Sequence, residues 1–345
     1  MVEDPGGFGV SWGLSMSPIR RKWVFDTGGA GPGAWEGGVG YALTKAALAT
    51  GAVPDMVIGS SVGAYMAANA ASGDPETFLK GWSNWGAEGI SPPAVRPEER
   101  GFFGARFFRA YLKHSIAYVL EDRIVERILD PRNPTRLVIV TTQLRRRNGQ
   151  PIGRRDMRRL FLQSLTRKWP VKYICSDYDY RAILFDSQPR TVTAAVRKLT
   201  PENIRSVIMA SCLIPWAMGM PLRVDGMDVI DGGFALKVPL RVPPDAVYAE
   251  LARSLQTDQT VVITPDPTGT LWETSMRIRR WNDCWDVEHT MEAGNLLIIS
   301  PPRKIRAGAL CRDHRLIWET FCEGVAHAER VLRSDPGRRF FDPRR

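Results

Sequence analysis

Residues 23–50 read WVFDTGGAGPGAWEGGVGYALTKAALAT, and this stretch decides the fold. Its first three residues form a short apolar run, and a glycine-rich loop follows at 28–33. From 34 to 50 apolar residues recur at roughly helical spacing, and Gly51 is well placed to end a helix. The stretch therefore predicts a strand, a glycine loop and a helix in direct succession.

The same order of elements repeats directly downstream. Residues 55–71 read DMVIGSSVGAYMAANAA, which contains an apolar strand, a tight turn at 59–63 and a helix-forming run. Two successive strand–turn–helix units predict an α/β fold in which a central, mostly parallel sheet is flanked by helices. Four further strands are expected, at 137–144, 228–230, 260–264 and 295–300. A closing helix is expected at 317–332.

Composition favours a packed protein with anionic partners. The 345 residues are 44% hydrophobic and 24% charged, which indicates a sizeable core rather than disorder. Lys and Arg number 47 against 37 Asp and Glu, and the resulting charge of +10 favours nucleic acid, phospholipid head groups or acidic metabolites as partners.

Cysteine usage and hydropathy bear on location. The five cysteines include no CxxC pair, which argues against a disulfide framework or a zinc ribbon and favours a reducing compartment. No apolar run approaches the ~18 residues of a membrane span. The first 22 residues lack the apolar core of a secretory signal. We therefore expect a cytoplasmic protein that can be peripheral to a membrane.

The chain is expected to divide into three parts. These are a flexible leader at 1–22, one large domain at 23–333 and a basic tail at 334–345. Residues 75–130 are mostly helical in pattern and are interpreted as a helical insertion within the domain.

Two segments are candidates for contact with an anionic membrane. Basic residues crowd 145–172 and supply most of the charge surplus. Four phenylalanines at 102–108 cluster beside Arg106, Arg109 and Lys113, a combination that suits a membrane interface. A core-facing helix with a solvated basic edge is the commoner use of such a pattern. Nucleic-acid binding by 145–172 is the weaker alternative, because no recognition motif accompanies the basic residues.

A candidate nucleophile lies in the second unit. Gly59, Ser61 and Gly63 match the pattern GxSxG, with an apolar strand directly before it and a helix directly after it. This is the context of a nucleophile elbow, in which the glycines allow a sharp turn and the helix N-terminus favours developing negative charge. Ser61 is therefore the predicted nucleophile.

A serine hydroxyl needs a base, and Asp231 is the best-placed candidate. It ends the short apolar strand 228–230 and is followed by Gly232 and Gly233, so its carboxylate can lie at the edge of the sheet. A Ser–His–Asp triad is the alternative, but no downstream histidine lies on an obvious strand-end loop. Three histidines follow Asp231: His289, His314 and His327.

The glycine loop at 28–33 is a candidate oxyanion hole. Its backbone N–H groups could stabilise the negative oxygen of a tetrahedral intermediate. A nucleotide phosphate loop is the competing interpretation, but the stretch lacks the lysine of GxxxxGK[ST] and, with Ala30, the spacing of GxGxxG.

These three motifs, in this order, resemble the patatin-like phospholipase family. The loop at 28–33, the elbow serine Ser61 and the Asp231-Gly232 motif each have a counterpart there. The segment ASCLIP at 210–215 is similar to the family's AS-x-x-x-P segment. The resemblance covers most of 23–240 and implies a three-layer patatin-like fold.

The resemblance implies a Ser–Asp dyad without a catalytic histidine. Asp231 would accept the proton of Ser61, which would attack an ester carbonyl and form an acyl-enzyme, while the N–H groups of Gly28, Gly29 and Ala30 hold the oxyanion. The motifs are supported by six further glycines: Gly31, Gly33, Gly59, Gly63, Gly232 and Gly233. The implied substrate is a lipid or phospholipid, the enzyme class is carboxylic ester hydrolase, and no metal or organic cofactor is implied.

The chain departs from the family pattern at three positions. Ala30 replaces the third glycine of the loop, Pro32 stands where many members carry Arg or Lys, and Lys237 stands where Asn often follows the aspartate motif. Pro32 offers neither charge nor N–H for a phosphate head group. A catalytically silent patatin-like protein that binds lipid or a partner is therefore kept as the second hypothesis.

Overall fold

The structure is a computed structural model of the chain. It describes residues 19–26, 28–83, 105–150, 152–165, 178–215, 218–273 and 294–341. Among these residues a single nine-stranded sheet forms the centre of the molecule. Its strands are β1 (Arg21–Phe25), β2 (Met56–Ser60), β3 (Arg136–Arg146), β4 (Tyr178–Asp186), β5 (Val196–Lys198), β6 (Leu222–Val224), β7 (Met227–Ile230), β8 (Gln259–Ile263) and β9 (Leu296–Ile299).

The strand order confirms the predicted mostly parallel sheet. The main path is β5-β4-β3-β2-β1-β8-β9, and every pair from β3 to β9 along this path is parallel. Strands β4 and β7 each pair antiparallel with β3, and β6 in turn pairs with β7. Strands β4, β5 and β6 were not among the predicted strands.

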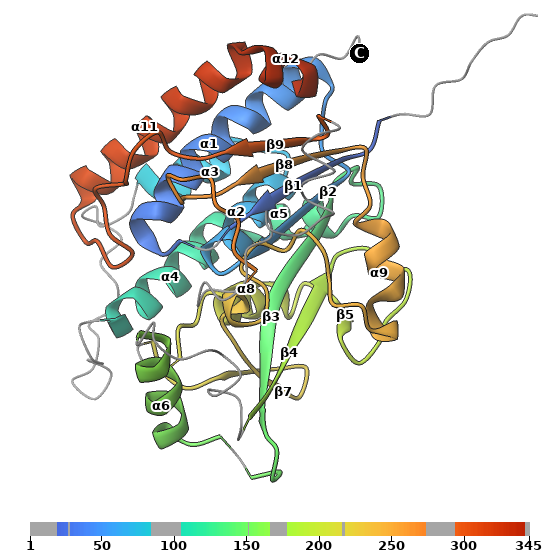
Figure 1. Ribbon diagram of the computed structural model, residues 1–345, viewed down its shortest axis with the longest axis vertical. Helices are drawn as coiled ribbons and strands as arrows, with labels where there is room; N and C mark the ends of the chain where they lie inside the picture. The colour runs from blue at the N-terminus through green and yellow to red at the C-terminus, as the bar shows by residue number, and fades with distance from the viewer. Residues whose placement is uncertain are drawn as a thin grey trace, which may run out of the picture.

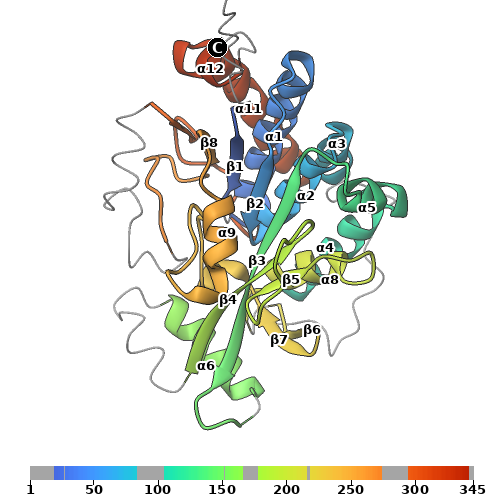
Figure 2. The same ribbon diagram turned by 90° about the vertical axis from the view of Figure 1, so that its right-hand side faces the viewer.

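Helices flank both faces of the sheet, as Figures 1 and 2 show. The α-helices are α1 (Ala30–Thr50), α2 (Val62–Ala71), α3 (Glu76–Ser83), α4 (Ala105–Val119), α5 (Asp122–Leu129), α6 (Arg154–Leu165), α8 (Ile204–Ser211), α9 (Ala249–Ser254), α11 (His314–Arg333) and α12 (Asp335–Phe341). Two short 3-10 helices are η3 (Gly232–Phe234) and η4 (Ala246–Tyr248).

Alternation along β1 separates the two faces. The Trp23 ring lies 6.0 Å from that of Phe341 in α12, whereas the Lys22 ammonium next to it donates to the Leu255 carbonyl at the end of α9, 2.7 Å away. Successive residues of a strand point to opposite faces, so α12 and α9 lie on opposite sides of the sheet. The result is the expected three-layer α/β architecture.

Helices α1 and α11 approach each other so closely that their backbones are in contact. A Cβ on Gly38 would lie 2.0 Å from the Phe321 carbonyl oxygen, and one on Gly324 would lie 2.2 Å from the Trp35 carbonyl oxygen. Only glycine allows the two helices to approach this closely. The contact fixes the position of α1, and with it the glycine loop that precedes α1.

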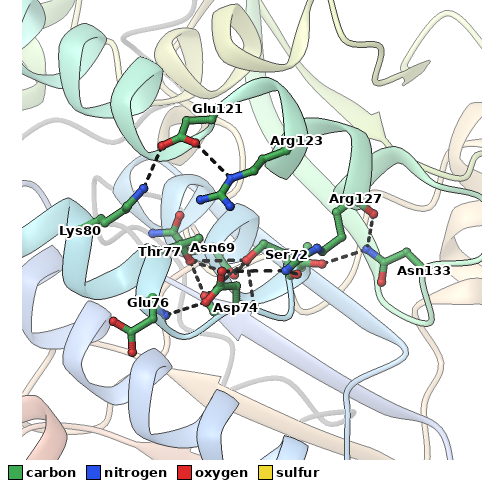
Figure 3. Close-up of polar contacts among 11 residues, drawn as sticks. Asn69, Ser72, Asp74, Glu76, Thr77, Lys80, Glu121, Arg123, Arg127 and Asn133 are labelled. Atoms are coloured by element: carbon green, nitrogen blue, oxygen red, sulfur yellow. Dashed lines mark hydrogen bonds and ion pairs between the residues drawn. The ribbon is translucent and has the colours of Figure 1, made fainter.

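Polar contacts fix the C-terminal end of α2, the helix that follows Ser61 (Figure 3). Ser72 Oγ donates to the Asn69 carbonyl at 2.6 Å, and Asn133 Nδ2 donates to the Ala71 carbonyl at 2.9 Å. Lys80 of α3 forms an ion pair of 2.8 Å with Glu121, which precedes α5. Helices α2, α3 and α5 are thereby tied together beside the sheet.

The ends of the chain differ in part from the expected leader and tail. Strand β1 begins at Arg21, inside the predicted leader, and residues 1–18 lie outside the described residues. Helix α12 lies inside the predicted tail, and its Phe340 and Phe341 are buried. No helix in the described part of the chain is long and apolar enough to span a membrane.

Candidate active site

Pairing with β3 brings Ser61 and Asp231 together. Strand β2 ends at Ser60 opposite Val140, and β7 ends at Ile230 opposite Thr142, so both strands finish close to each other along β3. The next residue of each is a predicted catalytic one. Ser61 Oγ donates to Asp231 Oδ2 at 2.7 Å, although the two residues are 170 positions apart.

The turn that carries Ser61 needs both glycines of the GxSxG pattern. A Cβ on Gly59 would lie 2.1 Å from the Gly63 carbonyl oxygen, and one on Gly63 would lie 2.1 Å from that of Asp26. Ser61 itself has φ 55 and ψ −134, a conformation that residues with a side chain rarely adopt. A strained backbone of this kind is what a nucleophile elbow requires.

Burial tunes the carboxyl group of Asp231 toward base catalysis. Asp231 is 4% exposed and Ser61 is 6% exposed. Burial raises the pKa of Asp231 to about 6, while hydrogen bonds from the Ser61 hydroxyl and the Gly233 N–H oppose the rise. A carboxylate with this pKa is ionised at neutral pH but holds a proton more strongly than an exposed aspartate.

Two further hydroxyl groups hold the pair in place. Ser211 Oγ accepts the Ser61 N–H at 2.9 Å and donates to the Val140 carbonyl at 2.6 Å. Thr142 Oγ1 donates to the Asp231 carbonyl at 2.8 Å. The sequence analysis gave neither residue a role. The ASCLIP segment pointed to the region of Ser211, but nothing in the sequence distinguished Thr142 from other strand residues.

The glycine loop presents its amides beside this pair. Gly29 has φ 72, and α1 begins at the next residue. Within the described residues, the N–H groups of Gly28 and Gly29 have no hydrogen-bond acceptor. The N–H of Ala30 is engaged, because it donates to the Ala309 carbonyl at 2.8 Å. Two of the three predicted oxyanion donors are therefore free in this conformation and the third is not.

A small apolar cavity of about 40 Å³ opens at Ser61. Its lining includes Trp82, Phe108, Ala309 and Leu310. A larger cavity, of about 660 Å³, lies at the other end of the sheet against Lys22 and contains neither Ser61 nor Asp231. Chemistry rather than size identifies the smaller cavity as the candidate active site.

Of the three histidines that follow Asp231, two are described, and both lie in α11. His314 Nε2 is hydrogen-bonded to the Ser83 carbonyl at 2.9 Å, and the His327 ring packs 5.8 Å from that of Trp35. His289 lies outside the described residues. Neither His314 nor His327 is positioned to act on Ser61.

The segments predicted to contact a membrane are partly engaged within the protein. Phe108 is 5% exposed and lines the Ser61 cavity. Phe102 and Phe103 lie outside the described residues. In the basic stretch, Arg146 pairs with Asp156, and Arg147 pairs with Asp179 at 3.0 Å. Residues 166–177 of that stretch also lie outside the described residues.

The described residues contain no group of three or more His, Cys, Asp or Glu side chains that could hold a metal ion.

One departure from the family pattern, Lys237, has a clear contact. Lys237 Nζ lies 3.2 Å from Asp26 Oδ2, directly before the glycine loop. The positive charge of Lys237 therefore offsets the negative charge of Asp26 next to the glycine loop.

Comparison with known proteins assigns the family. The family model described as patatin-like phospholipase matches residues 23–243, a range that contains all three motifs of the site. The chain belongs to the patatin-like phospholipase family. The predicted family and fold class are thereby confirmed, and the patatin-like family is one of hydrolases that act on lipid esters.

Two further comparisons add little to this patatin-like assignment. Among solved structures, the chain is similar to VipD from Legionella pneumophila at 12% sequence identity, with a TM-score of 0.36 and coverage of 92% of this chain and 67% of that chain. Similarity at that level carries no argument about function. A search of curated protein sequences found no match.

Proposed function

We propose that this protein is a serine lipid acyl hydrolase, similar to phospholipase A or lysophospholipase, that cleaves fatty-acyl esters through Ser61 and Asp231. The observation that carries the proposal is the buried hydrogen bond of 2.7 Å from Ser61 Oγ to Asp231 Oδ2. It lies next to free backbone N–H groups and an apolar cavity. The proposed nucleophile is thus adjacent to its base, to the oxyanion donors and to a site for the acyl chain.

The first half of the reaction would acylate Ser61. Asp231 takes the hydroxyl proton on Oδ2 as Ser61 Oγ forms a bond to the ester carbonyl carbon, whose oxygen becomes negative. The N–H groups of Gly28 and Gly29 would stabilise that oxygen. When the bond to the alcohol breaks, the alcohol takes the proton from Asp231 and leaves acyl-Ser61.

The second half would release the acid with the same groups. Water gives a proton to Asp231 while its oxygen bonds to the acyl carbon. The tetrahedral intermediate then breaks the bond to Ser61 Oγ, which recovers the proton. The carboxylic acid leaves, and the dyad returns to its starting state.

Covalent labelling with a fluorophosphonate tests the proposal, together with release of fatty acid from a panel of lipids. We expect the wild type to be labelled at Ser61 and to release fatty acid. Ser61→Ala should do neither, and Asp231→Asn should lose both because no base remains. A fully folded wild type that is neither labelled nor active would instead support the catalytically silent protein. The engaged Ala30 amide is the observation that favours that second candidate.

A further inference from the structure

We infer that the connection between β9 and α11, residues 300–313, closes the Ser61 cavity in the free protein. The connection opens the cavity when its exposed tip, residues 308–310, docks on an anionic lipid surface. We name residues 300–313 the β9–α11 connection. The inference rests on the proposed function and adds its regulation by the membrane. Figure 1 shows the connection between β9 and α11, at the same end of the molecule as the start of α1.

The β9–α11 connection is seated directly on the first turn of α1. Ala30 N–H donates to the Ala309 carbonyl at 2.8 Å, and Gly31 N–H donates to the Gly308 carbonyl at 3.1 Å. A Cβ on Gly31 would lie 2.1 Å from the Ala307 carbonyl oxygen, so the two backbones are in contact. These two carbonyls cap α1, which has no side-chain cap of its own.

This seating leaves too little room for a long acyl chain. Ala309 and Leu310 form part of the wall of the cavity of about 40 Å³. One water needs a cavity of at least about 10–15 Å³ measured in this way, so this cavity has room for only a few atoms of an acyl chain. A fatty-acyl chain needs several times that space. One wall must therefore move before such a chain can bind.

The β9–α11 connection is the wall best able to move. Trp82, which is 1% exposed, and Phe108, which is 5% exposed, also line the cavity, and both belong to the hydrophobic core. Gly308, Ala309 and Leu310 are instead exposed to solvent. The far end of the connection is anchored, because Asp313 Oδ1 accepts the Leu316 N–H at 3.0 Å and caps α11. Arg312 is also held, because its Cζ lies 5.8 Å from the centre of the Phe108 ring. Movement is thus confined to the residues before Arg312.

The chemistry of the tip matches an anionic lipid surface. Leu310 is a large apolar side chain with 42% of its surface exposed, at the mouth of the cavity. Residues 303–315 contain one acidic residue and five basic ones: Arg303, Lys304, Arg306, Arg312 and Arg315. An apolar side chain among cations is the combination that inserts at the head-group level of an anionic membrane.

The cations keep a surplus after their own ion pairs are counted. Arg303 pairs with Glu323 at 3.2 Å, and Arg306 and Arg315 pair with Glu319 at 3.1 Å and 3.0 Å. The five cations and the acids Asp313, Glu319 and Glu323 have a net formal charge of +2. Lys304 is exposed, whereas Arg312 lies over the Phe108 ring, 5.8 Å from its centre. These pairs are at the surface, where an ion pair holds its partners weakly and lipid phosphates can compete for the arginines.

Docking would act on the active site in two ways. Insertion of Leu310 into the lipid draws residues 308–310 away from α1, which widens the cavity. It also breaks the hydrogen bond from Ala30 to Ala309, and the freed Ala30 N–H then joins Gly28 and Gly29 as a third donor for the oxyanion. Two backbone hydrogen bonds hold the closed state, so we expect docking to raise the reactivity of Ser61 by about tenfold to a hundredfold.

The test measures the rate at which a small, soluble fluorophosphonate labels Ser61 in the full chain, with and without vesicles of ether-linked lipids that cannot be hydrolysed. Vesicles of phosphatidylcholine and phosphatidylglycerol in equal amounts should raise the rate by about tenfold or more. Vesicles of phosphatidylcholine alone should leave it unchanged, and added salt should weaken the stimulation.

Three variants locate the effect. Leu310→Asp should abolish the ratio between the rates with and without anionic vesicles. Leu48→Asp is the matched control, because Leu48 is 50% exposed but lies near the C-terminal end of α1, and it should keep the full ratio. Lys304→Glu should lower the ratio and leave the rate without vesicles unchanged.

Each result supports or overturns the inference. Equal labelling with and without anionic vesicles would overturn it, and so would full stimulation of Leu310→Asp. Stimulation by an acidic polypeptide but not by vesicles would assign the surface to a protein partner instead. If Ser61 is labelled under no condition, the proposed function itself fails. A labelled but unstimulated protein leaves the proposed function standing and removes only the membrane switch.

Discussion

Replacement of Asp231 by asparagine should make the protein more stable at alkaline pH while removing its activity. Burial raises the pKa of this carboxyl group from 3.8 to about 6. The folded state therefore binds the proton more tightly than the unfolded state does, and the stability of the wild type falls as the pH rises from 3.8 to about 6. That difference corresponds to about 3 kcal/mol at higher pH.

Asparagine keeps the shape of the side chain without the buried charge. Its amide can still accept the Gly233 N–H, which Asp231 Oδ1 accepts at 2.8 Å, and can still form a hydrogen bond with Ser61. We therefore expect Asp231→Asn to be about 1–3 kcal/mol more stable than the wild type at pH 8, and the advantage should vanish near pH 4. Urea unfolding at both pH values measures it.

The activity of the wild type should follow the same titration in the opposite direction. Because Asp231 must be ionised to take the Ser61 proton, the rate of ester hydrolysis should rise through a pH of about 6. Asp228→Asn is a matched control on β7, since that side chain is 45% exposed and lies near Arg223. A less stable Asp231→Asn at pH 8, or a rate that does not change around pH 6, would refute the reasoning.

Three further substitutions test the framework of the site. Ser211→Ala removes the hydrogen-bond partner of the Ser61 N–H and of a buried carbonyl. The free energy of unfolding in urea should therefore fall by about 1–3 kcal/mol, and fluorophosphonate labelling should slow. Ser211→Thr should recover part of the stability and part of the labelling rate. Ser61→Gly should be about 1 kcal/mol more stable than Ser61→Ala in thermal unfolding, because φ 55 strains any residue with a Cβ. Gly38→Ala should cost more than about 2 kcal/mol, since its Cβ would overlap the Phe321 carbonyl, whereas Gly308→Ala meets no atom within 4 Å and should be neutral in the same measurement.

Local patterns were enough to predict the elements that present the site. The glycine loop, the elbow and the short strand before Asp231 each combine a distinctive residue type with an apolar run. The helix after the loop begins at Ala30, four residues before its predicted start, so only the first residues of the predicted loop precede it. Strand β4 was missed because its first residues, YDYR, mix polar and aromatic side chains and are only partly buried. Its antiparallel partner, β3, is predicted from sequence because it is apolar and buried over most of its length.

The contacts that complete the site are not local in the sequence. Ser211 reaches the Ser61 N–H across 150 positions, and Ala309 reaches Ala30 from the far end of the chain. Nothing in the composition or spacing around Ser211 or Ala309 predicts such contacts. They depend on the register of β3 with its neighbours and on the close approach of α11 to α1, which only the folded chain defines.

The departure at Lys237 is explained by the buried acids that surround it. Asp26 and Glu36 are both fully buried beneath the glycine loop. Burial and the nearby Asp26 raise the pKa of Glu36 well above its usual range, which keeps that carboxyl group neutral. The ion pair of 3.2 Å with Lys237 then balances the charge of Asp26. A lysine in place of a neutral side chain therefore offsets the charge of a buried acid that lies two residues before the glycine loop.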